Sequence, residues 1–339
     1  MADINLKSLS KEQIEQFIRD SGQPVFRARQ LIHWIYERNA DSIEEITEFS
    51  RSLREELAKT ACISNLSLLD QQTSVDGTRK FLFGLEDGEA VESVLIPDDD
   101  RLTLCISSQA GCAMGCTFCL TGHLGLRRNL LPHEIVDQVI STARLIIPNK
   151  LTNVVFMGMG EPLANPESVI EALLRLTGLM KISPGRITVS TAGIVPAMKQ
   201  LAERVPRTNL AISLNATTDE VRDRIMPVNK KYPLKTLLEA CMEYPLKPRQ
   251  RITFEYVLLK GLNDSPTDAR RLVRLLKGIP SKINLIPFNP FSGCDYERPG
   301  DSDVLSFLEI LLKSHMPVFI RKSMGSDILA ACGQLKAHY

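Results

Sequence analysis

The chain has 339 residues, of which 44% are hydrophobic and 24% charged, with 41 Lys and Arg against 40 Asp and Glu. This composition excludes disordered, collagen-like and coiled-coil proteins, and the length suits one large α/β domain with a smaller accessory part. The net charge of +1 predicts no general attraction to nucleic acid, although a local basic patch is compatible with it. We find no secretory leader and no membrane span in the sequence, so we expect a cytoplasmic protein.

Residues 1–62 are expected to form a small helical domain. Apolar residues recur there at helical spacing, as at Ile14, Phe17 and Ile18, and Ser10 is placed to cap a helix. Because its charges are balanced, this domain either packs as a cap or contacts RNA through its shape. Two alternating runs then flank an Asp87-Gly88 turn, which predicts a β-hairpin and makes residues 63–97 a connector.

Residues 98–323 alternate between apolar strands and amphipathic helices. About six such strands are typical of a parallel (β/α) barrel, closed or partial, and a doubly wound sheet is the alternative. Glycine and polar residues follow the strands at their carboxyl ends, where both architectures place their sites. Residues 324–339 form a tail that contains Cys332.

Four of the eight cysteines lie close together in the sequence, at Cys105, Cys112, Cys116 and Cys119. In a reducing compartment such clustering indicates metal ligands or reactive thiols. The last three form a C-x3-C-x2-C loop after the first barrel strand, and three thiolates can hold three irons of a four-iron cluster, leaving the fourth iron open. Structural zinc is the alternative, because His123 follows Cys119 closely.

The cysteine loop resembles that of the radical S-adenosylmethionine (SAM) superfamily, and Gly158-Met159-Gly160-Glu161-Pro162 resembles its GGEP element. The resemblance narrows to the RlmN branch of the RlmN/Cfr family of radical SAM RNA methyltransferases. It rests on VESVLIPDDDRLTLCISSQAGC, GCTFC, RRNL, NVVFMGMGEPL, INLIPFNPF and AACGQL, and it spans essentially the whole chain. It implies a partial (β/α)6-type radical SAM barrel with an N-terminal helical accessory domain and a β-hairpin connector.

The function implied by this resemblance is methylation of C2 of an adenine in 23S ribosomal RNA, in the peptidyl-transferase region. Adenine 37 of some transfer RNAs is allowed as a second substrate. The resemblance implies one [4Fe-4S] cluster on Cys112, Cys116 and Cys119, two SAM molecules per turnover, an external one-electron donor and a monomer. A Cfr-type C8 methyltransferase is the nearest alternative, and a non-catalytic zinc-containing RNA-binding protein is the second.

The same match assigns roles to single residues. Cys332 would carry the methyl group as S-methylcysteine, since an adenine ring carbon has no lone pair for ordinary displacement. A methylene radical on Cys332 would add to the ring carbon, and Cys105 would resolve the protein–RNA adduct through a transient disulfide with Cys332. Glu92 would accept the C2 proton. Contacts to SAM are implied for six residues at or near strand ends: Gly160, Glu161, Ser190, Ser213, Asn215 and Asn289.

The chain departs from the pattern of the branch at Asn215, where histidine is usual, and at Ser292, where proline is usual. Between Arg222 and Lys260 lie nine basic residues against four acids. Together with Arg127 and Arg128, this run predicts a basic face for RNA phosphates, and a solvated helix face is the alternative.

Overall fold

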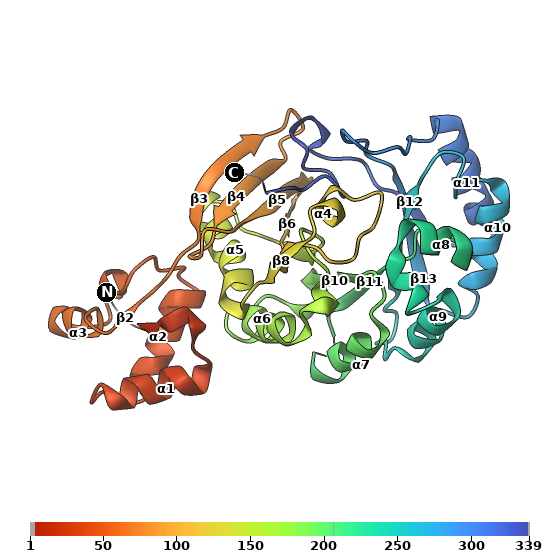
Figure 1. Ribbon diagram of the computed structural model, residues 1–339. Helices are drawn as coiled ribbons and strands as arrows, with labels where there is room; N and C mark the ends of the chain where they lie inside the picture. The colour runs from red at the N-terminus through yellow and green to blue at the C-terminus, as the bar shows by residue number, and fades with distance from the viewer. Residues whose placement is uncertain (1–3, 206, 338–339) are drawn as a thin grey trace.

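The computed structural model describes residues 4–205 and 207–337 (Figure 1). Its centre is a curved ten-stranded sheet in the order β14-β13-β12-β11-β10-β9-β6-β5-β4-β3. The seven strands from β14 to β6 pair in parallel, and β5, β4 and β3 continue the sheet in antiparallel pairing. The bounds are β3 (Ser67–Thr73), β4 (Arg79–Gly84), β5 (Ala90–Asp98), β6 (Arg101–Cys105), β9 (Asn153–Phe156), β10 (Ile187–Thr191), β11 (Asn209–Ser213), β12 (Ile252–Leu258), β13 (Ser281–Pro287) and β14 (Val318–Ile320).

Helices cover the outer face of the parallel strands, and the curved sheet stays open between β14 and β3 (Figure 1). The parallel strands follow one another in sequence order without the reversal that defines a doubly wound sheet, so the partial barrel is confirmed and the doubly wound alternative is wrong. A short helix, α8 (Asp219–Ile225), occupies the crossover before α9 and was not predicted. The outer helices are α5 (Pro132–Leu145), α6 (Pro166–Gly178), α7 (Val195–Arg204), α9 (Leu234–Glu243), α10 (Pro266–Leu275) and α11 (Asp301–Lys313).

The N-terminal segment is helical, as predicted, and lies to one side of the barrel (Figure 1). Ser10 caps the first helix by accepting from Gln13 N at 3.2 Å. Two very short strands, which the sequence did not predict, pair in parallel and join the two ends of the segment. The elements are β1 (Ile4–Asn5), α1 (Lys11–Asp20), α2 (Phe26–Tyr36), α3 (Arg51–Leu57) and β2 (Ala61–Cys62).

The predicted hairpin is present, with β4 and β5 paired around the Asp87-Gly88 turn. Gly88 has a left-handed φ of 88°, which glycine adopts without steric cost. Strand β5 also pairs with β6, through Val94 and Cys105 among others. The segment expected as a connector therefore extends the barrel wall, because its strand β5 is apolar and buried along most of its length.

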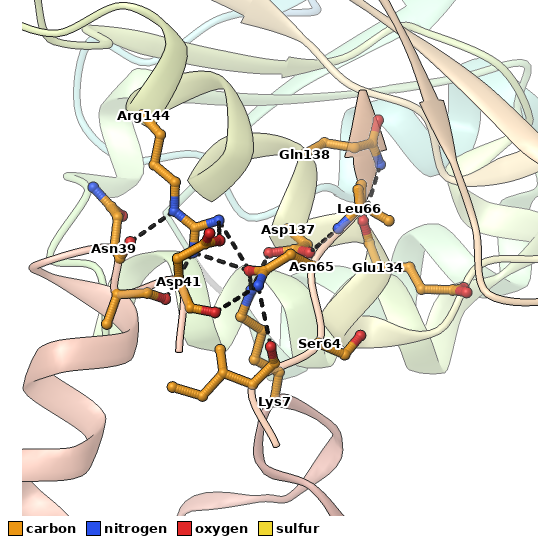
Figure 2. A network of polar contacts seen from close by, with 12 residues as sticks. Lys7, Asn39, Asp41, Ser64, Asn65, Leu66, Glu134, Asp137, Gln138 and Arg144 are labelled. Carbon is orange, nitrogen blue, oxygen red and sulfur yellow. Dashed lines mark hydrogen bonds and ion pairs between the residues drawn. The ribbon is translucent and has the colours of Figure 1, made fainter. Parts of the chain in front are cut away.

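The junction between the helical domain and the barrel is a polar network on α5 (Figure 2). The ammonium of Lys7 pairs with Asp137, and both side chains are at most 3% exposed. Asp137 Oδ2 also accepts from Leu66 N at 2.8 Å. Arg144 donates to the backbone oxygens of Asn39 and Ala40, both at 2.7 Å. An opposite charge thus satisfies the buried Lys7, and backbone acceptors satisfy the half-buried Arg144.

Across the two described ranges, no helix combines the length and the apolar character that crossing a membrane requires.

Candidate functional site

The carboxyl ends of the parallel strands surround a cavity of about 170 Å³, which we call the inner cavity. Strand ends from β9 to β13, the cysteine loop and the C-terminal tail all contribute to its wall. It brings together every residue expected to contact SAM or iron, and also the expected methyl carrier: Cys112, Cys116, Cys119, Gly160, Glu161, Ser190, Ser213, Asn215, Asn289 and Cys332.

The segments that flank the cysteine loop pair as a small two-stranded sheet of β7 (Gln109–Gly111) and β8 (Leu126–Asn129). Cys112 N donates to Gly125 O at 2.8 Å, which fixes the start of the loop. Gly111 has a φ of 77°, and a Cβ there would lie 2.0 Å from Gly125 O. Only glycine allows this approach, and it directs the loop into the inner cavity.

The three loop thiols are crowded into low-dielectric surroundings. Burial raises the pKa of Cys112 to about 12 and also raises the pKa values of Cys116 and Cys119. Negative charge on its neighbours raises the pKa of Cys116 further. Thiolates at this position therefore need a strongly positive partner, which iron supplies.

The donor set fits an iron–sulfur cluster held by three protein ligands. In residues 4–205 and 207–337, no three His, Cys, Asp or Glu side chains converge as ligands of one metal ion. A cluster spreads its three cysteines over three irons, so it does not require that convergence. His123, considered as a zinc ligand, instead lies against Thr117 O at 3.0 Å and lines a separate cavity.

Glu161 is fixed at the end of β9 by backbone donors. Its carboxylate accepts from Ala192 N at 2.7 Å and from Leu163 N at 2.9 Å. Burial raises its pKa, while these donors act in the opposite direction. Gly160 beside it has a φ of 95°, and a Cβ there would lie 2.6 Å from the side chain of Gln109. The sharp turn therefore needs glycine to bring Glu161 to the cavity.

Asn215 links two strand ends as well as lining the cavity. Its Oδ1 accepts from Val257 N at 2.8 Å, and its backbone oxygen accepts from Asn263 Nδ2 at 2.7 Å. Its φ of 58° is left-handed, a conformation that asparagine tolerates better than most residues. Asn289 donates to Cys332 O at 3.3 Å and so contacts the tail directly.

The other two cysteines with expected roles, Cys105 and Cys332, lie close enough for the charge of one to affect the other. Cys105, at the end of β6, is buried, whereas Cys332 is exposed to the cavity space. Burial raises the pKa of Cys105 to about 12, and negative charge on Cys332 contributes to this rise. Both are free thiols in the structure.

Cys332 also lines a second cavity of about 580 Å³, which we call the outer cavity. This cavity lies between the β5–β6 turn, the end of β14 and the tail. Cys332 therefore belongs to a wall between the two cavities. The residues common to both linings are Ile286, Asn289, Arg321 and Cys332.

Glu92, the expected proton acceptor, is buried on β5 and is not among the residues lining either cavity. Its Oε1 lies 3.1 Å from Lys80 Nζ, and its Oε2 accepts from Lys336 N at 2.8 Å. In this arrangement the carboxylate holds the end of the tail.

Sequence reasoning missed two charged residues of the inner cavity. Arg321 follows β14, and Glu255 lies within β12. Burial alone would lower the pKa of Arg321, but charge on Cys332 and Glu255 raises it. Two signals in the sequence could have identified these residues. Arg321 is a charge at the end of an apolar strand, and Glu255 is an acid inside one.

The expected basic face is only partly correct. Arg222 is fully buried and donates to Ala192 O at 2.7 Å and Leu214 O at 3.0 Å. Arg128 is paired with Glu134 at 2.7 Å. Lys230 and Lys231 are exposed, which both the RNA-binding face and the solvated helix face require.

Known protein families match both the helical domain and the barrel. The chain matches the family model described as "Ribosomal RNA large subunit methyltransferase N-terminal domain" over residues 4–63 and the Radical SAM superfamily over residues 106–273. It is 53% identical to the dual-specificity RNA methyltransferase RlmN of Pelobacter propionicus, over 98% of this chain and 95% of that relative. It is 55% identical to that of Geobacter sulfurreducens, over 98% and 92%.

The chain belongs to the RlmN family of radical SAM RNA methyltransferases. A crystal structure of a radical SAM methyltransferase from Sphaerobacter thermophilus has the same fold, with a TM-score of 0.94 and 40% identity over 99% of this chain and all of that one. Membership in the RlmN family implies a [4Fe-4S] cluster and SAM. The expectation of an enzyme is confirmed, and the non-catalytic zinc protein is wrong.

Proposed function

We propose that this RlmN-family enzyme methylates C2 of an adenine in 23S ribosomal RNA and adenine 37 of some transfer RNAs. The curated relatives carry the name dual-specificity RNA methyltransferase, which supports two RNA substrates. The observation that carries the mechanism is the position of Cys332 on the wall between two cavities, with Cys105 close by. The enzyme would work as a cytoplasmic monomer with an external one-electron donor.

The inner cavity would hold the cofactors. Cys112, Cys116 and Cys119 would bind one [4Fe-4S] cluster, and Glu161 and the other strand-end residues would bind SAM, two molecules per turnover. When bound, these groups supply a methyl group and a radical able to remove a hydrogen atom from it. The protein encloses this chemistry between the strand ends and the tail, away from water.

Cys332 and Cys105 would act in sequence. Cys332 carries the methyl group on its sulfur and presents its carbon to the adenine, to which that carbon becomes bonded. Cys105 then attacks the sulfur of Cys332, so that a disulfide forms while the bond between sulfur and carbon breaks. The CH2 carbon stays on the adenine, keeps the electron pair of the broken bond and takes up a proton, so that it becomes the methyl group. An external reductant must then restore both thiols.

The outer cavity would receive the adenine. Its volume of about 580 Å³ lies within the range of small-molecule sites, and its lining includes Phe319, which is 59% exposed. An exposed aromatic ring can stack on an unpaired base, and Lys322 is placed to meet a phosphate. Because the target base belongs to folded RNA, it must be turned out of its stack to enter.

Glu92 would accept the proton from C2. Lys80 and the Lys336 amide now occupy its two oxygens, so this role requires the end of the tail to move away. A Glu92→Gln enzyme should therefore accumulate the protein–RNA adduct and release little product.

Mass spectrometry of digested ribosomal and transfer RNA tests the proposal, after anaerobic reaction of the cluster-loaded protein with SAM and a reductant. We expect 2-methyladenosine in both RNAs. Detection of 8-methyladenosine instead would assign the C8 reaction.

Cysteine variants test the roles of the two thiols. Cys332→Ala should abolish methylation while RNA binding is kept, and Cys105→Ala should trap a covalent protein–RNA adduct. Cys62→Ala, in the helical domain, is the matched control and should keep full activity. Methylation by the Cys332→Ala protein would overturn the mechanism.

A further inference from the structure

The tail that carries Cys332 has little regular structure to hold it in place. Between residues 324 and 337, its one helical turn is the 3-10 segment Ser326–Ile328. Gly325, Leu329 and Gly333 have left-handed φ values of 67°, 52° and 84°. Contacts from other elements must therefore determine where Cys332 lies.

One set of contacts comes from the turn between β3 and β4, at residues 74–78, which we call the tether turn. Asp76 Oδ2 accepts from Gly325 N at 2.8 Å. In the opposite direction, Ser74 Oγ donates to Asp327 Oδ1 at 2.6 Å. Each segment thus supplies one carboxylate to the other, across about 250 positions of sequence.

Asp76 is held ready for this contact. Its Oδ1 accepts from Thr78 N at 2.9 Å, which fixes the carboxylate within the turn. Burial alone would raise its pKa, but the donors of Gly325, Thr78 and Ser74 lower that pKa to about 2. Asp76 is therefore charged at neutral pH, and hydrogen bonds to a charged acceptor are the stronger kind.

The contact at Gly325 is transmitted to Cys332 through a tight loop. Ala330 N donates to Gly325 O at 2.8 Å, which closes the loop two residues before Cys332. A Cβ on Gly325 would lie 2.8 Å from Ala330 Cβ and 2.9 Å from Thr78 Cγ2. The tether turn and the loop therefore pack too closely for one to shift without the other.

Beyond Cys332, the tail is attached to the cysteine loop. Leu120 N donates to Gly333 O at 2.7 Å, and Thr121 Oγ1 donates to Leu335 O at 2.7 Å. Both donors lie in α4 (Leu120–His123), directly after Cys119. The segment that contains Cys332 is therefore held by hydrogen bonds to the tether turn on one side and to α4, next to the cluster ligands, on the other.

We propose that Asp76 and Asp327 are positioning residues that set the place of the Cys332 sulfur between the inner and outer cavities. They act only through the tail, since neither lines a cavity. This inference rests on the proposed function, in which Cys332 carries the methyl group.

Alkylation of Cys332 tests the tether without any turnover. The cluster-loaded protein is treated anaerobically with iodoacetamide, and the modified tail peptide is quantified by mass spectrometry. We expect Asp76→Asn and Asp327→Asn to react about tenfold faster at Cys332, because each loses a hydrogen bond to a charged group. Asp70→Asn is the matched control, since Asp70 is an exposed acid on β3 of the same hairpin.

Kinetics then test the consequence for the reaction. Asp76→Asn should lower kcat for RNA methylation about tenfold and leave KM for SAM unchanged, and Asp76→Glu should recover much of the loss. Equal alkylation rates in Asp76→Asn and Asp70→Asn would overturn the proposal, and so would faster alkylation with an unchanged kcat. Wild-type protein that never acquires a methyl group on Cys332 would instead overturn the proposed function, while the alkylation result would still stand.

Discussion

The junction of the helical domain and the C-terminal tail both depend on carboxylates, but in different surroundings. At the junction, Asp137 and its partner Lys7 are almost completely buried. At the tail, Asp327 is exposed and its counterpart in the tether turn, Asp76, is half-buried, and both accept from backbone or hydroxyl donors. Water can replace the donors of the tail but not those of the junction. We therefore expect the helical domain to stay docked and the tail to detach more easily.

The largest effect is expected from breaking the junction. Asp137→Ala would leave the buried ammonium of Lys7, whose pKa burial already lowers, without its partner. Loss of one member of a buried pair costs about 3–5 kcal/mol of unfolding free energy, measurable by urea unfolding. Glu167→Ala, which breaks an exposed pair with Arg204, should cost less than about 1 kcal/mol. Equal losses of unfolding free energy in Asp137→Ala and Glu167→Ala would contradict the expected difference between a buried and an exposed ion pair.

A smaller effect is expected at Arg144. Arg144→Met removes the donors to Asn39 O and Ala40 O while keeping much of the side-chain volume. We expect a loss of about 2 kcal/mol, with faster hydrogen exchange in the helical domain. Arg204→Met is the control at an exposed position. Unchanged exchange at the junction would show that Lys7 and Asp137 hold it alone.

In the tail, a disruptive substitution should hardly change the free energy of unfolding of the whole protein. In Gly325→Ala, the added Cβ would lie less than 3.0 Å from side-chain atoms of Ala330 and Thr78. The left-handed φ of this position would also strain alanine. Because the tail can detach before the barrel unfolds, we expect the loss of unfolding free energy to stay below about 1 kcal/mol. Alkylation of Cys332 should nevertheless become faster. A cooperative loss of several kcal/mol would show that the tail is part of the core.

The smallest effect is a dependence on pH. The pKa of Asp76 is lowered from 3.8 to about 2, so its contribution is complete above pH 3.8 and is lost as the pH falls toward 2. The protection of the Gly325 amide from hydrogen exchange should decrease over this window, relative to Asp76→Asn. Identical pH profiles in the two proteins would exclude a charged tether.

Local patterns were sufficient for the parallel strands, whereas the partial barrel and the residues of the inner cavity were predicted through the family resemblance. The alternation of apolar strands and amphipathic helices predicted the parallel order, and the carboxyl ends of parallel strands necessarily meet at one edge. For this reason Gly160, Ser213 and Asn289, which are far apart in sequence, line the same cavity. The spacing of the cysteine loop indicated a metal site with zinc as an alternative, and the family resemblance favoured the iron–sulfur cluster.

The remaining features depend on contacts that no local pattern reveals. Lys7 meets Asp137 across 130 positions, and Asp76 meets Gly325 across 249. Arg222 resembled a surface cation in the sequence, yet carbonyl oxygens from separate loops satisfy it in the interior. The hairpin was predicted correctly, but its place in the main sheet follows from the pairing of β5 with β6.

The place of Cys332 in the chain has a consequence for synthesis. Ribosomes make proteins from the N-terminus, so the tether turn and the cysteine loop are made well before Cys332. The helical domain and the strands of the main sheet are therefore all synthesised before Cys332, the proposed methyl carrier, is added. Both segments that contact this part of the tail, the tether turn and α4, thus precede Cys332 in the order of synthesis.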